Sequence, residues 1–138
     1  MAYEESLKSV SLDADSSLAT YTGVPNQPGS ATPNSGHQYK FVKVTGRHQV
    51  GLATAATNEV VVGVLQNKPQ VTGQAATVAI SGITLVRASV ALAAGDIVKA
   101  AADGRAAKGT PGTDVGIGVV ITPAAAADQL ATVLLRVN

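Results

Sequence analysis

Eight short runs rich in Val, Ile and Thr follow one another from Gln38 to the C-terminus, bounded by Gly, Asn or Asp. Such residues favour β-strands, and this many short strands in about a hundred residues indicate antiparallel sheets. Two runs, 60-VVVGVL-65 and 117-IGVVI-121, are apolar on both faces, which is typical of a strand covered twice. We therefore predict an all-β fold, a small antiparallel β-barrel or sandwich that oligomerises. The expected strands are 39–45, 49–52, 59–65, 76–80, 83–88, 97–100, 115–122 and 132–137.

Two blocks of this region recur at an offset of 55 residues without a gap. The block 62-VGVL-65 matches 117-IGVV-120, and 74-QAATVAI-80 matches 129-QLATVLL-135. The repeat predicts that the body, residues 37–138, is built from two related β units, roughly 39–88 and 95–137. A chance match within a Val- and Ala-rich chain is the alternative.

The first 36 residues differ from the rest, because Ser, Asp, Asn, Pro and Gly dominate them. Pro25, Pro28 and Pro33 favour extended backbone, so we expect residues 1–36 to form an extended N-terminal arm and linker. On this interpretation, deleting residues 2–36 leaves the β body folded. A disordered tail is the alternative. The apolar side chains expected to dock this arm on a partner subunit are Tyr3, Leu7, Val10, Leu12 and Tyr21.

Charge and composition argue against several classes of function. The net charge is +1, and the ten basic and nine acidic residues are scattered, so we expect no nucleic-acid partner. No stretch approaches the ~20 apolar residues of a membrane span, and the N-terminus lacks an apolar signal segment, so we expect no membrane partner and synthesis in a cytoplasm. Charged residues make up only 14% of the chain, which suggests a surface partly covered by other subunits, unless it simply reflects the high Ala content.

The chain has few residues suited to catalysis or metal binding. It has no Cys, and it has two His residues. We expect His37 in a Gly/Ser linker and His48 in a hairpin turn, with no third residue to orient either ring. Asp13 and Asp15 resemble the start of a calcium loop, but the required Gly and closing Glu are missing. We therefore expect no enzyme activity, no catalytic residues, no cofactor and no metal. The only helical turn expected is 123–129, where Pro precedes four Ala.

Three segments in order carry a family resemblance: 63-GVLQNKPQVTGQAATVAISGI-83, 91-ALAAGDIVKAAADGRAAKG-109 and 118-GVVITPAAAADQLATVLL-135. They share a Gly-Val-apolar strand, an Ala-Gly-Asp turn leading into an Asp-Gly hairpin, and a closing Val-Leu-Leu strand. In this pattern the chain resembles the decoration, or cement, proteins of tailed-bacteriophage heads.

The resemblance implies a structural virion protein with a β-barrel-like body. Such a protein would bind the outer capsid surface as a homotrimer, bridge subunits of the major capsid protein and stabilise the head, after synthesis in the host cytoplasm. A fibre- or baseplate-type virion module that binds a host receptor or glycan is the alternative, although three Tyr, one Phe and no Trp are few aromatics for a sugar site. A small hydrolase or isomerase on a β-barrel is a third possibility, and it would require a convergent polar pocket.

Overall fold

The computed structural model describes residues 7–19, 36–57, 59–114 and 116–136, and every regular element within them is a β-strand. The prediction of an all-β fold is confirmed. Residues 76–80 and 83–88, expected as two strands, belong to one long strand, and residues 123–129 form no helical turn, since Ala124 instead pairs with Leu92 in an isolated β-bridge. The strands are β1 (Lys8–Ala14), β2 (Phe41–Gly46), β3 (Gln49–Leu52), β4 (Val61–Leu65), β5 (Ala75–Arg87), β6 (Ile97–Ala100), β7 (Ala106–Lys108), β8 (Gly118–Thr122) and β9 (Leu130–Arg136).

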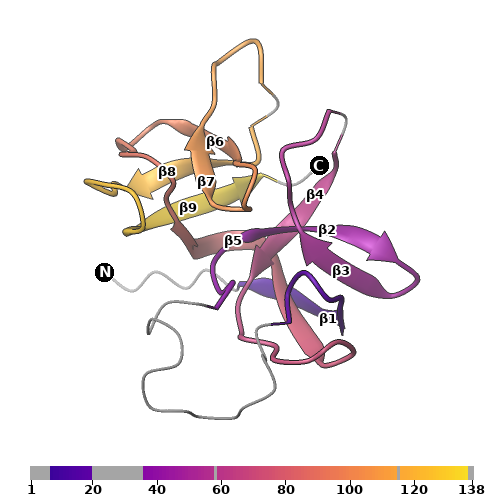
Figure 1. Ribbon diagram of the computed structural model, residues 1–138. Coiled ribbons are helices and arrows are strands. Elements are labelled where there is room, and N and C mark those ends of the chain that lie inside the picture. Colours follow the sequence, from indigo (N-terminus) through magenta and orange to yellow (C-terminus); the bar gives the residue numbers. More distant parts are fainter. Residues whose placement is uncertain (1–6, 20–35, 58, 115, 137–138) are drawn as a thin grey trace.

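The first five strands close into a barrel, which we call the N-terminal barrel. Its strand order is β1-β3-β2-β4-β5, and β5 pairs back with β1 (Figure 1). The pairing of β1 with β3 is parallel and the other pairings are antiparallel. Closure leaves this sheet without a free edge, so the strand pairings support one another around the ring.

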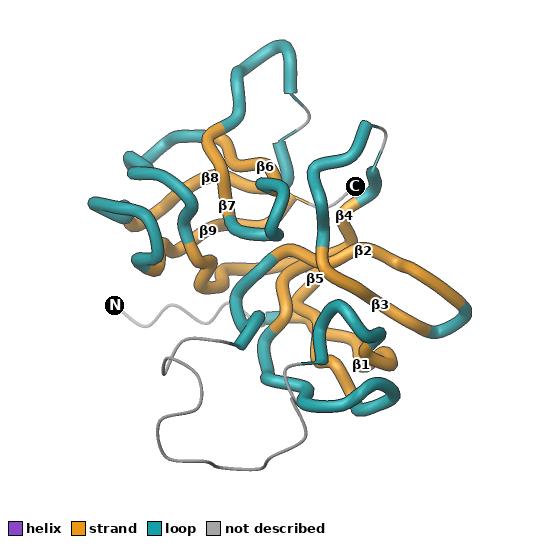
Figure 2. The backbone as a smooth tube through the Cα atoms, in the orientation of Figure 1, coloured by secondary structure: helices purple, strands orange, loops and turns teal. Residues whose placement is uncertain are grey.

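The second half of β5 starts another five-stranded unit, the C-terminal barrel, in the order β5-β9-β8-β6-β7. A parallel bridge between Ala88 and Ala106 brings its first and last strands together, and the Ser89 amide donates to the Ala106 carbonyl over 2.8 Å. Figure 2 shows β6 to β9 on one side of the molecule and β1 to β4 on the other, with β5 running between them. One strand therefore serves both barrels.

The two barrels have the same strand register. Val64 pairs with Ala79 and Leu65 with Val78. The equivalent residues 55 positions later pair in the same way, Val119 with Leu134 and Val120 with Val133. On its other side, Val133 pairs with Thr84 in the second half of β5. In the N-terminal barrel the equivalent residue, Val78, pairs with Val10 of β1. The second half of β5 therefore occupies the place of β1. The two units divide inside β5, and not between residues 88 and 95 as the sequence repeat suggested.

The interiors of the two barrels are built from corresponding side chains. Seven buried residues form the core of the N-terminal barrel, and each has a buried counterpart in the core of the C-terminal barrel. The first set is Ala14, Leu18, Val42, Val50, Leu65, Ala76 and Val78, and the second is Ala88, Leu92, Val98, Ala106, Val120, Ala131 and Val133. The repeat thus extends from the strand register to the packing of the core.

The structure corrects the expected boundary of the N-terminal arm. Residues 8–14 form β1, which pairs with β5 and β3, and Leu18 is fully buried in the barrel core. This segment belongs to the body because its apolar side chains complete the core and its backbone closes the sheet. The other expected arm residues, 1–6 and 20–35, lie outside the described residues.

Candidate functional site

The structure locates three of the five predicted contact residues. Leu7 and Val10 are each 39% exposed, so their side chains remain partly available at the surface. Leu12 packs against the core of the N-terminal barrel. Part of its side chain is therefore used within the barrel, and its predicted contact with the capsid or a neighbouring subunit stays a prediction. Tyr3 and Tyr21 lie outside the described residues.

The two histidines lie beside charged side chains. His37 Nδ1 is 3.2 Å from Lys40 Nζ, and burial together with the charges of Lys40 and Arg87 lowers the pKa of His37 below its ordinary value. His48 Nδ1 is 3.9 Å from the Asp13 carboxylate, on the exposed surface of the N-terminal barrel. In the described part of the chain, no group of three or more His, Asp or Glu side chains is placed to hold a metal ion.

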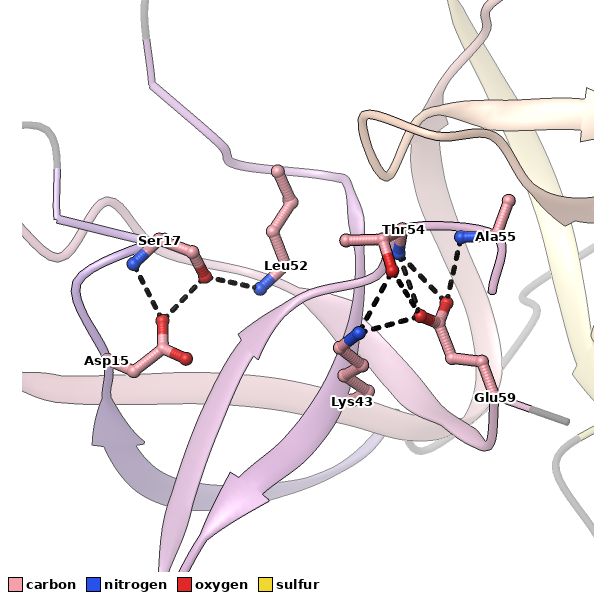
Figure 3. Close-up of polar contacts among 7 residues, drawn as sticks. All are labelled: Asp15, Ser17, Lys43, Leu52, Thr54, Ala55 and Glu59. Atoms are coloured by element: carbon pink, nitrogen blue, oxygen red, sulfur yellow. Dashed lines mark hydrogen bonds and ion pairs between the residues drawn. The ribbon is translucent and has the colours of Figure 1, made fainter. Parts of the chain in front are cut away.

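The most buried charged group among the ion pairs is the Glu59 carboxylate, which fastens the loop between β3 and β4 to strand β2 (Figure 3). The side chain of Glu59 is 5% exposed and accepts hydrogen bonds from the Thr54 amide at 2.9 Å, the Thr54 hydroxyl at 2.7 Å and the Ala55 amide at 3.1 Å. Lys43 Nζ lies 2.8 Å from the same carboxylate. Burial raises the pKa of Glu59, but these hydrogen bonds outweigh burial and lower the pKa to about 2.

The same fastening recurs in the C-terminal barrel. Asp114 accepts a hydrogen bond from the Thr110 amide at 2.7 Å and pairs with Lys99 Nζ at 3.1 Å. The Thr110 amide and Lys99 lower the pKa of Asp114. Lys99 and Asp114 lie 56 and 55 residues after Lys43 and Glu59, so the repeat conserves an ion pair as well as the strands.

Asp15 and Ser17 tie the residues after β1 to β3 (Figure 3). The Asp15 carboxylate accepts a hydrogen bond from the Ser17 amide at 2.8 Å, and the Leu52 amide donates to the Ser17 hydroxyl oxygen over 2.7 Å. A Cβ added to Gly51 would clash with the Asp15 carboxylate, so a larger residue at this position would displace the carboxylate from its place. Asp15 and Ser17, which the sequence placed in an extended arm, therefore fix the N-terminal segment to the barrel.

The Glu59→Gln substitution is expected to lower the free energy of unfolding at pH 7 by about 1–3 kcal/mol, because Lys43 and the loop amides lose a charged acceptor. The pKa of Glu59 is about 2, below the ordinary 4.5, so its contribution is present above about pH 4.5 and is lost as the pH falls toward 2. Urea unfolding of both proteins at pH 7 and pH 3 measures the difference.

The Asp114→Asn variant is the matched control for this prediction. The side chain of Asp114 is 24% exposed, compared with 5% for Glu59, so the equivalent loss is expected to be smaller. A destabilisation by Glu59→Gln that is the same at both pH values would contradict the role assigned to the Glu59 charge.

The two barrels join where the residues before β2 lie between β5 and the β6–β7 turn. The Arg87 amide donates to the Tyr39 carbonyl over 2.9 Å, and the Phe41 amide donates to the Gly104 carbonyl over 2.7 Å. In the N-terminal barrel the corresponding seam is closed directly, since the Asp13 amide donates to the His48 carbonyl over 2.9 Å. The start of β2 is therefore inserted into the seam of the C-terminal barrel.

These features define a class of protein: an all-β double barrel in which charged side chains fasten loops to the sheet. No helix in the described residues is long and apolar enough to cross a membrane. No protein-family profile and no curated protein matches the chain. A solved structure with a similar fold is the head fiber gp8.5 N base of bacteriophage phi29, with a TM-score of 0.59 over 94% of each chain. The sequence identity is 18%, and the likeness establishes a shared fold.

Proposed function

We propose that this chain is a structural protein of a phage virion. In this proposal it binds the outer capsid surface as a trimer and stabilises the shell by bridging subunits of the major capsid protein. The observation that supports it best is the fold, which over 94% of the chain is that of a phage head fiber base. The resemblance of residues 63–83, 91–109 and 118–135 to capsid decoration proteins points to the same class.

A protein of this kind acts through binding alone. A clamp that binds only the assembled lattice shifts the equilibrium toward the assembled state. A trimer strengthens the clamp, because several modest contacts on one lattice site act at high effective concentration. Exposed apolar side chains on the described surface offer area for such contacts: Leu7, Val10, Val44, Val60, Val71, Leu85, Val90, Ile121 and Leu130.

Cosedimentation with expanded empty phage heads tests the proposal. The purified protein is expected to pellet with undecorated heads until the sites are filled, and to raise the temperature at which the heads come apart. Heads that already carry a full coat of decoration protein are the control, and they should bind no more. If the protein stays in the supernatant with undecorated heads, the proposal fails.

A second candidate is a fibre- or baseplate-type module that binds a host receptor or glycan. The observation that favours it is that the similar solved structure belongs to a head fiber. The same sedimentation assay separates the two candidates when host cells replace the heads. Pelleting with cells and not with heads would support the second candidate.

A further inference from the structure

Four apolar side chains form a continuous row across the outer face of the C-terminal barrel. Ile83 pairs with Leu134, Leu134 with Val119, and Val119 with Ile97, so the row crosses β5, β9, β8 and β6. All four side chains are partly exposed. Three more apolar side chains on the same strands are exposed: Leu85, Ile121 and Leu130. We call the four-residue row the apolar row.

In the N-terminal barrel, three of the four positions equivalent to this row are covered, and the fourth, Ser9, pairs with Ala79 and is exposed. Phe41 pairs with Val64, and Val64 pairs with Ala79. In the C-terminal barrel, Ile97 pairs with Val119 and Val119 with Leu134 in the same register. Phe41, Val64 and Ala79 are fully buried, and they belong to the hydrophobic cluster that contains the core of the C-terminal barrel. This outer face of the N-terminal barrel is therefore the face on which the C-terminal barrel sits.

The contacts at this covered face show how one barrel docks on another. The Phe41 amide donates to the Gly104 carbonyl, in the β6–β7 turn of the covering barrel, and a Cβ added to Gly104 would lie 2.6 Å from a Leu52 methyl group. The position that corresponds to Gly104 in the N-terminal barrel is His48, in the β2–β3 turn, and both residues have positive φ, 80° and 58°. The two turns thus share a positive φ at this position, although the β2–β3 turn is shorter than the β6–β7 turn.

We infer that the apolar row binds the N-terminal barrel of a second copy of this chain, near its β2–β3 turn, as the C-terminal barrel covers the equivalent face within one copy. The Asp13 amide and the His48 carbonyl close the seam of the second copy, so the row rests against this turn without the insertion of a strand. The occupant is a second copy because the chain already covers the equivalent face with a barrel of its own fold. The contact is head-to-tail: Ile97 of one copy lies near the β2–β3 turn of the next, as Phe41 lies near Gly104. The inference rests on the self-association included in the proposed function, and it does not depend on capsid binding.

Crosslinking with single-cysteine variants tests this geometry. The natural chain has no Cys, so Ile97→Cys and His48→Cys each introduce one thiol into the full-length protein. A short bismaleimide is expected to link the two variants when they are mixed and allowed to exchange subunits, and to give several-fold less product with either variant alone. Strong linking of one variant to itself would indicate a two-fold contact and overturn the head-to-tail arrangement.

Substitution of the apolar row supplies a second measurement. Val119→Asp places a charge at the centre of the row, and it is expected to weaken self-association at least tenfold in analytical ultracentrifugation while circular dichroism still reports the β fold. Val60→Asp is the control, because Val60 is 71% exposed and lies outside the row. An oligomer that survives Val119→Asp unchanged overturns the inference and leaves the proposed trimer standing, whereas a monomeric natural protein overturns both.

Discussion

Deletion of residues 2–36 is expected to unfold the N-terminal barrel instead of releasing a separable arm. β1 makes six register pairs with β5 and two with β3, so its removal opens both seams of the closed sheet. The deletion also removes Ala14 and Leu18 from the core and exposes their buried neighbours to water. Circular dichroism and urea unfolding should show loss of strand content and of a cooperative transition, and the truncated protein should aggregate through its open edges.

Two further variants separate the loss of β1 from the shortening of the chain. Deletion of residues 2–6 keeps the whole of β1 and is expected to keep the cooperative transition. Leu12→Asp retains the full chain length and places a charge against the barrel core, so it should reproduce much of the destabilisation. A protein lacking residues 2–36 that unfolds with the natural midpoint would show that β1 is dispensable, as the sequence alone suggested.

The strands that could be predicted best are those whose ends carry turn residues. Residues 49–52 and 97–100 are observed with the bounds expected from the sequence. The Asp103-Gly104 pair marked the turn after β6, and Gly104 has the positive φ of 80° that such a turn needs. Local chemistry decides these boundaries, so a single sequence is enough to find them.

The role of β1 could not be predicted from composition. Ser9, Ser11 and Asp13 of β1 are exposed to solvent, and polar residues of this kind led to the prediction of an arm. Val10, Leu12 and Ala14 alternate with them, which is the pattern of a half-buried strand. Leu12 and Ala14 pack in the core, whereas Val10 is 39% exposed. Only the tertiary fold shows that this alternation closes a barrel.

The continuity of β5 was hidden by Ser81 and Gly82, which the sequence suggested as a break between strands. Gly82 has a φ of 98°, so the chain does change direction there. Ser81 pairs both with Lys8 of the N-terminal barrel and with Arg136 of the C-terminal barrel. The irregular position is where the strand passes from one barrel to the other, and an offset repeat cannot reveal such a shared strand.

The polar network around Glu59 was not predicted, because Lys43 and Glu59 are 16 residues apart and meet only in the folded sheet. The internal repeat could have revealed this contact, because Lys99 and Asp114 follow Lys43 and Glu59 at nearly the same offset as the surrounding strands. A charged pair conserved across two copies of a unit within one chain indicates a structural contact. That reasoning would have predicted that Asp114 pairs with Lys99.

Phe41→Ala is expected to lower the free energy of unfolding by about 3–5 kcal/mol. Phe41 is the only Phe of the chain and the largest fully buried side chain among the residues that the structure describes. It projects from the outer face of the N-terminal barrel into the cluster that includes the C-terminal core, so its loss leaves a cavity at the junction of the barrels. Equilibrium urea unfolding followed by circular dichroism measures the change.

Val44→Ala on the same strand is the control, and it should shift stability by less than about 0.5 kcal/mol because Val44 is 57% exposed. Hydrogen exchange adds a local test: the Phe41 and Arg87 amides, which bond across the junction, should lose protection more than the Val78 and Val133 amides inside the two barrels. A loss below about 1 kcal/mol, or equal loss of protection at all four amides, would mean that Phe41 does not hold the two barrels together. The covered face of the N-terminal barrel would then be a poor guide to what binds the apolar row.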